Sequence, residues 1–308
     1  MTNLQNARDY QELLDERVET SPYAYATMFK AEGYVARRTA RQRFALLRAL
    51  DGKLRHILRP TEHVFYVTWG TTHSLAEQFF TGWMASALNM RALVFTTERV
   101  LLLQINARKT SVRELVAQIP YTAIVSVRKS WLGSCRIKLR DKTLLTFLRV
   151  PKGDMKFLIE FLSDIVKGSG APFEISTPLG VQHLCPHCYV HVPAFPPACP
   201  QCGGRLKLAS KAALLSFIFP GLGDWYLGHR GFAAMEIVGS AFIWWVLIVA
   251  PLLAPEDPDL GPITLEYWLT ALFIMLVIHG TDAMMTRHAA RKGHYPAGPM
   301  PHSAQHGS

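Results

Sequence analysis

Residues 232–253 read FAAMEIVGSAFIWWVLIVAPLL, an apolar run of 22 residues whose only ionisable side chain is Glu236. As an α-helix this run would be about 33 Å long, which matches a hydrocarbon core of roughly 30 Å. A second run at 267–285, YWLTALFIMLVIHGTDAMM, is interrupted only by His279 and Asp282. The two runs predict a pair of membrane-spanning helices in the carboxy-terminal third of the chain.

The charges around the two runs predict their orientation. The connecting segment 254–262 carries three acids and neither Lys nor Arg, whereas basic residues flank the pair at its other end. Because segments rich in Lys and Arg stay in the cytoplasm, we expect both termini there. The flanking basic residues are Arg205, Lys207, Lys211, Arg230, Arg287, Arg291 and Lys292.

Three ionisable side chains fall inside the predicted spans, namely Glu236, His279 and Asp282. Because ionisable groups in lipid are costly, such residues are candidates for a functional role by default. The alternative is a structural role, in which Asp282 pairs with Arg230 or His229 and locks the two helices together.

The segment before the first span, residues 212–231, is apolar but too short to cross a membrane, and it predicts an interfacial or re-entrant helix that ends at Pro220. Its Pro-Gly-x-Gly and Tyr-x-Gly turn, with the late Asp282, resembles the two-transmembrane-helix domain family over residues 210–292. The resemblance implies an architecture rather than an activity. The string Gly221-Leu222-Gly223-Asp224 is similar to that of intramembrane aspartyl proteases, but two spans are too few to surround their carboxylate dyad.

A second motif lies at residues 183–208, which read HLCPHCYVHVPAFPPACPQCGGRLKL. Two Cys-x-x-Cys pairs separated by ten residues offer four thiolates, and Zn²⁺ takes four such ligands at tetrahedral corners. A redox dithiol is the alternative for the first pair, but no thioredoxin-like βαβ pattern surrounds it. The second pair and its glycines resemble a zinc-ribbon knuckle. We therefore predict a structural Zn²⁺ ion held by Cys185, Cys188, Cys199 and Cys202.

Between residues 60 and 168 the pattern changes to short runs rich in Val, Ile, Leu, Phe and Thr. Bounded by turn residues, these runs predict antiparallel strands, and the helical spacing of apolar residues in 153–166 predicts a helix that closes the sheet. The fifth cysteine, Cys135, is expected to be a small buried apolar group. The predicted strands cover 63–69, 92–97, 100–105, 112–119, 123–129, 135–139 and 144–149.

The stretch 93–102, with its Thr97-Glu98-Arg99 turn, followed by Ile119-Pro120 and 123–127, resembles the bacterial pleckstrin-homology-like (PH-like) domains. The resemblance implies a non-catalytic module that binds lipid head groups or protein partners. Basic residues near these strands are candidate contacts for an anionic ligand, although edge strands also use such charges to discourage aggregation. The candidates are Arg99, Arg108, Lys109, Lys129 and Arg136.

Residues 7–59 have a helical pattern that is acidic in its first half and basic in its second. In the basic half, Phe44, Leu47, Leu50, Leu54 and Ile57 share one face. Such an amphipathic helix can lie on anionic lipid, pack on a neighbouring domain or bind nucleic acid. No aromatic stacking motif accompanies the arginines, so nucleic acid is not the expected partner.

The composition agrees with a membrane location. The chain has 308 residues, 33 Lys and Arg against 23 Asp and Glu, a net charge of +10 and a mean hydropathy of +0.12. It is too apolar to be disordered, and its charge suits an anionic membrane surface or nucleic acid equally well. The sequence contains no phosphate-binding P-loop, Gly-x-Ser-x-Gly or His-Glu-x-x-His motif, so an enzyme is not expected.

The expected fold class is a multidomain α+β membrane protein with amino-terminal helices, a PH-like antiparallel β-sheet capped by a carboxy-terminal helix, a zinc ribbon and a transmembrane helical hairpin. The expected function is a bacterial inner-membrane scaffold that binds lipid or protein partners in the cytoplasm, with a homo-oligomer as a compatible state. The alternative is a subunit or regulator of a larger membrane complex that uses Glu236 and Asp282. The expected segments are 1–59 (helical region), 60–168 (PH-like domain), 169–182 (linker), 183–208 (zinc ribbon), 209–292 (two-helix transmembrane domain with a short preceding interfacial helix) and 293–308 (disordered tail).

Overall fold

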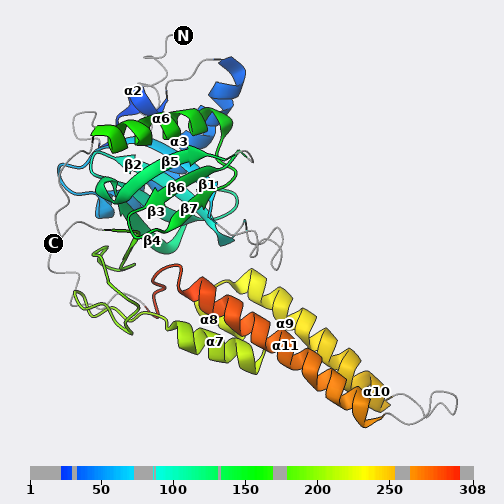
Figure 1. Ribbon diagram of the computed structural model, residues 1–308. Helices are drawn as coiled ribbons and strands as arrows, with labels where there is room; N and C mark the ends of the chain where they lie inside the picture. The colour runs from blue at the N-terminus through cyan, green and yellow to red at the C-terminus, as the bar shows by residue number, and fades with distance from the viewer. Residues whose placement is uncertain are drawn as a thin grey trace. The chain divides into compact units, whose positions relative to one another are not determined.

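The chain is a mixed α+β protein that divides into two compact units, Met1–Pro193 and Ala194–Ser308 (Figure 1). The computed structural model describes residues 22–29, 33–72, 86, 88–130, 133–168, 179–253 and 264–298. The predicted acidic helix near the amino terminus lies outside these ranges.

Two antiparallel sheets form the centre of the amino-terminal unit, with strand orders β1-β2-β3-β4-β8 and β5-β6-β7. The larger sheet contains β1 (Val64–Thr71), β2 (Met90–Thr96), β3 (Arg99–Ile105), β4 (Val112–Pro120) and β8 (Gln182–Leu184). The smaller sheet contains β5 (Ile124–Lys129), β6 (Cys135–Leu139) and β7 (Leu144–Phe147). The strands predicted between residues 60 and 168 are confirmed. The additional strand β8 pairs with β4, so the segment expected to begin the zinc ribbon also extends the larger sheet.

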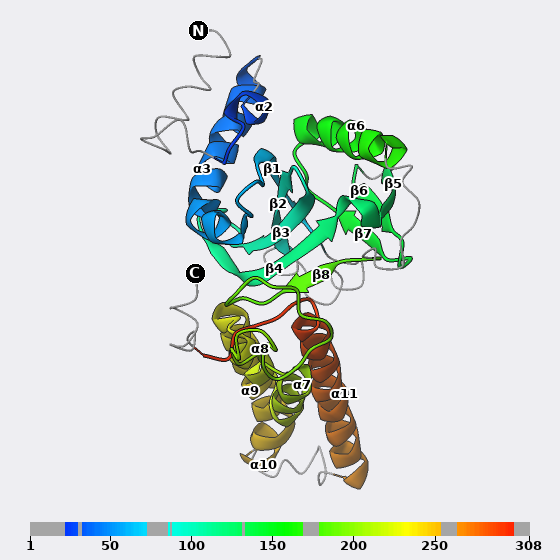
Figure 2. The ribbon, with the colours of Figure 1, turned by 90° about the vertical axis from the view of Figure 1, so that its left-hand side faces the viewer.

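Both faces of the larger sheet are covered by helices. Val94 on β2 belongs to the core beneath α3 (Gly33–Ile57), whereas its neighbours Leu93 and Phe95 belong to the core beneath α6 (Lys152–Gly168). Figure 2 shows the two helices flanking the sheet. A strand buried on both faces reads as a continuous apolar run, which explains why this stretch shows no polar alternation. The described residues of this unit also form the short helices α2 (Tyr25–Met28) and η2 (Tyr121–Ala123).

The basic amphipathic helix α3 packs on the sheet. Its predicted apolar face is buried, and Leu47, Leu50 and Leu54 are fully enclosed in the core. Arg41 and Arg48 lie on its exposed side. Of the three roles open from the sequence, the structure shows packing on the neighbouring domain.

One arginine of α3 is buried and connects the two helices around the edge strand β1. The Nη2 atom of Arg43 lies 2.6 Å from the Oδ1 atom of Asp154, in the first turn of α6. The hydroxyl of Tyr66 on β1 donates to the same oxygen at 3.0 Å, and the Thr68 hydroxyl donates to Oδ2. Asp154 therefore accepts hydrogen bonds from α3 and β1. Its negative charge also stabilises the amino-terminal end of its own helix, α6.

The carboxy-terminal unit contains two helices that are long and apolar enough to cross a membrane, as the sequence predicts. The first, Arg230–Leu253, runs through α9 (Arg230–Trp244), the π-helical segment η3 (Trp245–Val249) and α10 (Ala250–Leu253). The second is α11 (Leu265–Ala290). They are preceded by α7 (Ala209–Ile218), where a short helix was expected, and by α8 (Leu222–Leu227).

The beginning of the carboxy-terminal tail is ordered, contrary to the expectation for residues 293–308. The amide of Lys207 donates to the carbonyl of Tyr295 at 2.8 Å, and the amide of Ala297 donates to the carbonyl of Arg205 at 2.9 Å. Tyr295 is buried. Backbone pairing with a segment about ninety residues earlier explains this order, and composition carries no signal for such pairing.

Candidate metal centre and polar sites

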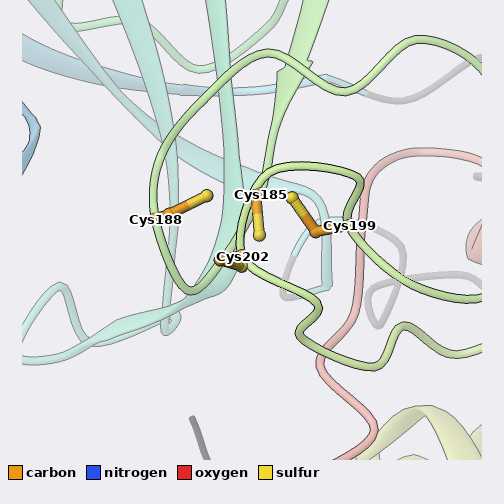
Figure 3. Close-up of side chains that lie close together, drawn as sticks. All are labelled: Cys185, Cys188, Cys199 and Cys202. Carbon is orange, nitrogen blue, oxygen red and sulfur yellow. The ribbon is translucent and has the colours of Figure 1, made fainter. Parts of the chain in front are cut away.

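The four predicted cysteine ligands come together at two similar turns (Figure 3). In each turn, the amide four residues after the first cysteine donates to the carbonyl of that cysteine: Tyr189 to Cys185 at 3.0 Å and Gly203 to Cys199 at 2.9 Å. That fourth residue has a positive φ in both turns, 57° at Tyr189 and 67° at Gly203. A glycine adopts this left-handed conformation readily at Gly203, and the turn that begins at Cys185 reaches it with Tyr189 instead of a glycine.

The cysteine cluster fits a zinc ion. The four sulfur atoms all lie within 4.8 Å of one another, and Zn–S bonds of about 2.3 Å in a tetrahedron place the sulfurs roughly 3.8 Å apart. Cys185 and Cys199 are buried, and the amide of His187 donates to Cys185 Sγ at 3.4 Å. Amide donors of this kind stabilise a thiolate. The cluster could hold a metal such as zinc, which would contribute folding free energy to so small a module.

Two histidines of the cysteine-rich segment and the fifth cysteine do not belong to the cluster. His187 is buried, whereas His191 is exposed. Cys135 lies on β6 with only 1% of its surface exposed, as predicted, and burial raises the pKa of its thiol to about 12. An unreactive buried thiol is consistent with packing rather than with chemistry.

The basic residues predicted as anionic-ligand contacts do not form one site. Arg99 is buried, and Lys109 lies over the ring of Trp69 at 3.8 Å. Arg108 is exposed between β3 and β4, and Lys129 is exposed at the end of β5. Burial lowers the pKa of Lys109.

Arg99 belongs to a buried network that the sequence did not reveal. Its Nη2 atom lies 2.7 Å from Glu62 Oε2 and donates to the carbonyl of Ile57 at 3.1 Å. Burial alone would raise the pKa of Glu62, but hydrogen bonds from Arg99, from the Thr96 hydroxyl and from the Arg59 amide outweigh it, so this pKa lies below its ordinary value. Because each charge is satisfied by the other, Arg99 is a structural residue.

Arg136 lies on the exposed face of the smaller sheet, beside two basic residues that were not predicted as ligand contacts. Together with Arg128 and Lys138 it lines an open groove of about 430 Å³. The alternation of buried and exposed residues along β6 was a readable signal for the pair Arg136 and Lys138. The contribution of Arg128 depends on strand register, which the sequence did not provide.

In the carboxy-terminal unit, the carboxylates of Asp224, Glu236 and Asp282 all lie within 4.8 Å of one another. Asp282 was expected to pair with His229 or Arg230, and the structure corrects this. His229 Nδ1 lies 2.7 Å from Asp224 Oδ1 instead, and Asp282 Oδ2 accepts from the amide of Gly221 at 3.0 Å. The reason is local geometry: His229 begins α9 directly after the α8 turn that carries Asp224.

The glycines of the Pro-Gly-x-Gly turn permit this close packing. Gly221 has a φ of 89°, and a Cβ atom there would lie 2.7 Å from the carbonyl oxygen of Ala233. A Cβ atom at Gly223 would lie 2.3 Å from the carbonyl oxygen of Ala212 on α7. Such distances exclude any side chain, so the motif brings α8 against its neighbouring helices.

His279 links three elements of the same unit. Its Nδ1 lies 2.7 Å from the carbonyl oxygen of Phe217, and the indole N–H of Trp244 donates to its Nε2 at 3.2 Å. Because an indole only donates, Nε2 is the acceptor and Nδ1 is the donor. Immediately after Trp244 the helix becomes π-helical, and the carbonyl of Leu247 accepts a hydrogen bond from Tyr267 at 3.0 Å. Polar contacts therefore join the first apolar helix to α11 at two positions along their length.

Comparisons of this chain with protein-family models, with curated proteins and with solved structures find no match.

Proposed function

We propose that this chain is a non-enzymatic binding protein of a bacterial inner membrane, in which a helical hairpin holds a zinc ribbon and a PH-like domain at the cytoplasmic surface. The role of the anchored part is to bind lipid head groups or protein partners. Tethering raises the effective concentration of a weak site at the membrane, so that modest affinity is sufficient for occupancy.

The exposure of the two apolar helices carries this proposal. Within their most apolar windows only 11% and 28% of the residues are buried. Large apolar side chains such as Val238, Phe242 and Phe273 are more than 60% exposed. Soluble proteins rarely leave contiguous apolar surface of this kind in water, whereas a bilayer would cover it. The core helix of a soluble protein would be largely buried.

Charge and metal chemistry support the orientation. Basic residues flank the pair on one side, and the connecting segment 254–262 is acidic, so the positive-inside bias favours cytoplasmic termini. A cluster of four thiolates also requires a reducing compartment to stay unoxidised. These two independent requirements agree.

The arrangement of the acids supports a structural rather than a catalytic role for Asp224. One of its oxygens is occupied by His229, and the other accepts from the Thr286 hydroxyl at 3.0 Å. A carboxylate held on both oxygens is poorly placed to act as one half of an aspartyl-protease dyad with Asp282.

Extraction and labelling of the full-length protein test the anchor. Alkaline carbonate should leave the protein in the membrane pellet. In intact cells, an impermeant maleimide should react with an Asp257→Cys variant, whereas the matched Ser303→Cys variant should react only after permeabilisation. Release by carbonate, or the reverse labelling pattern, contradicts the proposal.

A second candidate function, a subunit or regulator of a larger membrane complex, is favoured by the meeting of Glu236 and Asp282. Their carboxylate oxygens lie within 4.8 Å of one another, and Glu236 Oε2 has no partner among the described residues. Blue native electrophoresis distinguishes the two candidates. If Glu236→Gln stays in the membrane but leaves a high-mass complex that wild type occupies, the second candidate is supported; an unchanged migration favours the scaffold.

A further inference from the structure

Three basic side chains lie on the outer face of the smaller sheet. On β6, Arg136 and Lys138 are exposed while the residues on either side of each are buried. On β5, Arg128 is the register partner of Arg136, and Ser126 is the register partner of Lys138. The four residues therefore form a compact block of neighbouring positions on one face.

This block is hollowed into an open groove of about 430 Å³. Two exposed apolar side chains complete its lining, Val125 at 42% and Leu144 at 54% exposure. Leu144 is the register partner of Lys138 on β7, so an apolar group lies directly beside a charged one.

The positive charge of the groove is not balanced by the protein. Like charges directly opposite on paired strands are destabilising, and Arg128 and Arg136 are such a pair. Among the residues that the structure describes, no carboxylate forms an ion pair with Arg128, Arg136 or Lys138. Elsewhere in the same unit, Arg43 and Arg99 are each buried beside an acid, and these two ion pairs show what a balanced arginine looks like. An anionic ligand would remove the repulsion between the two arginines.

We propose that this groove binds the phosphate group of an anionic phospholipid. Guanidinium groups match phosphate oxygens with paired hydrogen bonds, and a lysine adds a compact charge. The apolar side chains Val125 and Leu144 favour a lipid over a soluble phosphate ester, because they can enter the region between head groups and acyl chains. Among the residues that the structure describes, no aromatic ring lines the groove, so these residues offer no platform for stacking of nucleic-acid bases.

This inference rests on the proposed function, since the tether is what keeps the groove near lipid. Each basic side chain at an anionic membrane surface changes the equilibrium constant for binding to that surface about fivefold. Reversing the charge of one arginine removes one attraction and adds one repulsion, so Arg136→Glu should reduce the equilibrium constant for binding by about 25-fold.

The test uses full-length protein in lipid nanodiscs, with an environment-sensitive fluorophore on a Thr143→Cys variant. Thr143 is exposed at the turn before β7, next to the groove. In discs that contain phosphatidylglycerol, we expect a blue shift of emission and quenching by brominated lipid. Both signals should be absent in pure phosphatidylcholine discs and strongly reduced by Arg136→Glu.

Arg108→Glu is the matched control, because Arg108 is exposed in the same unit but does not line the groove. An equal loss of signal in this control would show general attraction rather than a site, and would overturn the proposal. A response to millimolar glycerol phosphate in neutral discs that equals the response to phosphatidylglycerol would also overturn it, because the ligand would then be a soluble phosphate ester. No response to phosphatidylglycerol in the wild type overturns it outright.

Protection of Cys135 from alkylation verifies folding of each variant. If Arg136→Glu unfolds the unit, the milder pair Arg128→Gln and Lys138→Gln replaces it, with an expected loss of about 25-fold for two charges. Failure of the groove and failure of the anchor are distinguishable. A protein that resists carbonate extraction but ignores lipid charge refutes only the groove, whereas a protein that carbonate releases refutes the proposed function.

Discussion

Removal of the Asp154 carboxylate is the sharpest test of how the amino-terminal unit is held together. In Asp154→Ala the guanidinium of Arg43 stays buried, with only 7% of its side chain exposed, and loses its anion. The hydroxyls of Tyr66 and Thr68 lose their acceptor as well. Breaking one side of a buried ion pair costs about 3–5 kcal/mol. At 1.36 kcal/mol per factor of ten, the unit should open about 150 to 5,000 times more often.

Cys135 provides the assay in the full-length, membrane-embedded protein. Its thiol is 1% exposed and its pKa is raised to about 12 by burial, so it reacts with an alkylating reagent only when the unit opens. The rate of Cys135 alkylation, read by peptide mass spectrometry, therefore reports the opening equilibrium when reclosing is fast.

Two further variants make the result decisive. Asp164→Ala on the same helix removes an exposed acid whose pairing with Lys167 is long, 3.8 Å, and should change the rate by about twofold at most. The double variant Arg43→Met with Asp154→Leu leaves no unpaired charge and should recover most of the loss. If Asp154→Ala is alkylated as slowly as Asp164→Ala, the assigned role of the ion pair is wrong.

Three other changes have expected outcomes. Metal analysis should find about one zinc per chain in wild type and in Cys135→Ser, and almost none in Cys199→Ser, because only the last removes a tetrahedral ligand. The pKa of Glu62 is lowered in the folded state, so its ionisation stabilises the fold. This stabilisation is complete above the ordinary glutamate pKa of about 4.3 and is lost as the pH falls through the lower folded pKa. Acid unfolding followed by near-ultraviolet circular dichroism should show this loss of stability in wild type but not in Glu62→Gln. Gly223→Ala should lower the free energy of unfolding of the solubilised protein by about 1–3 kcal/mol, because its Cβ atom would meet a backbone oxygen. Gly239→Ala should not, because there is open space around its Cβ position. Equal melting temperatures for the two variants would contradict the packing argument.

Local patterns predicted the elements well because each depends on residues near in sequence. The period of two in β6 and the helical spacing of α3 and α6 both survive into the structure. The four cysteines were also predictable, because metal chemistry restricts ligand type and spacing. The helices long enough to span a membrane follow from composition alone.

Features that depend on long-range register were not predictable. The pairing of Tyr295 with Lys207, the strand β8 and the meeting of Arg128 with Arg136 each require knowledge of which segments become neighbours. The left-handed Tyr189 was missed for a different reason. Composition favours glycine at such a position, and only the likeness of the two cysteine turns would have indicated that Tyr189 takes the place of Gly203.

The polar groups of the carboxy-terminal unit divide into two kinds once their partners are considered. Asp224, His279 and the backbone-bound oxygen of Asp282 all have acceptor or donor partners on other elements, so helix packing accounts for them. Glu236 differs, since its Oε2 atom is buried without a partner among the described residues. Burial of an unsatisfied carboxyl oxygen costs stability, and packing alone would favour an apolar residue at this position. Helix packing explains the glycine turn and the hydrogen-bonded acids, whereas the buried Oε2 atom of Glu236 points to a role beyond packing.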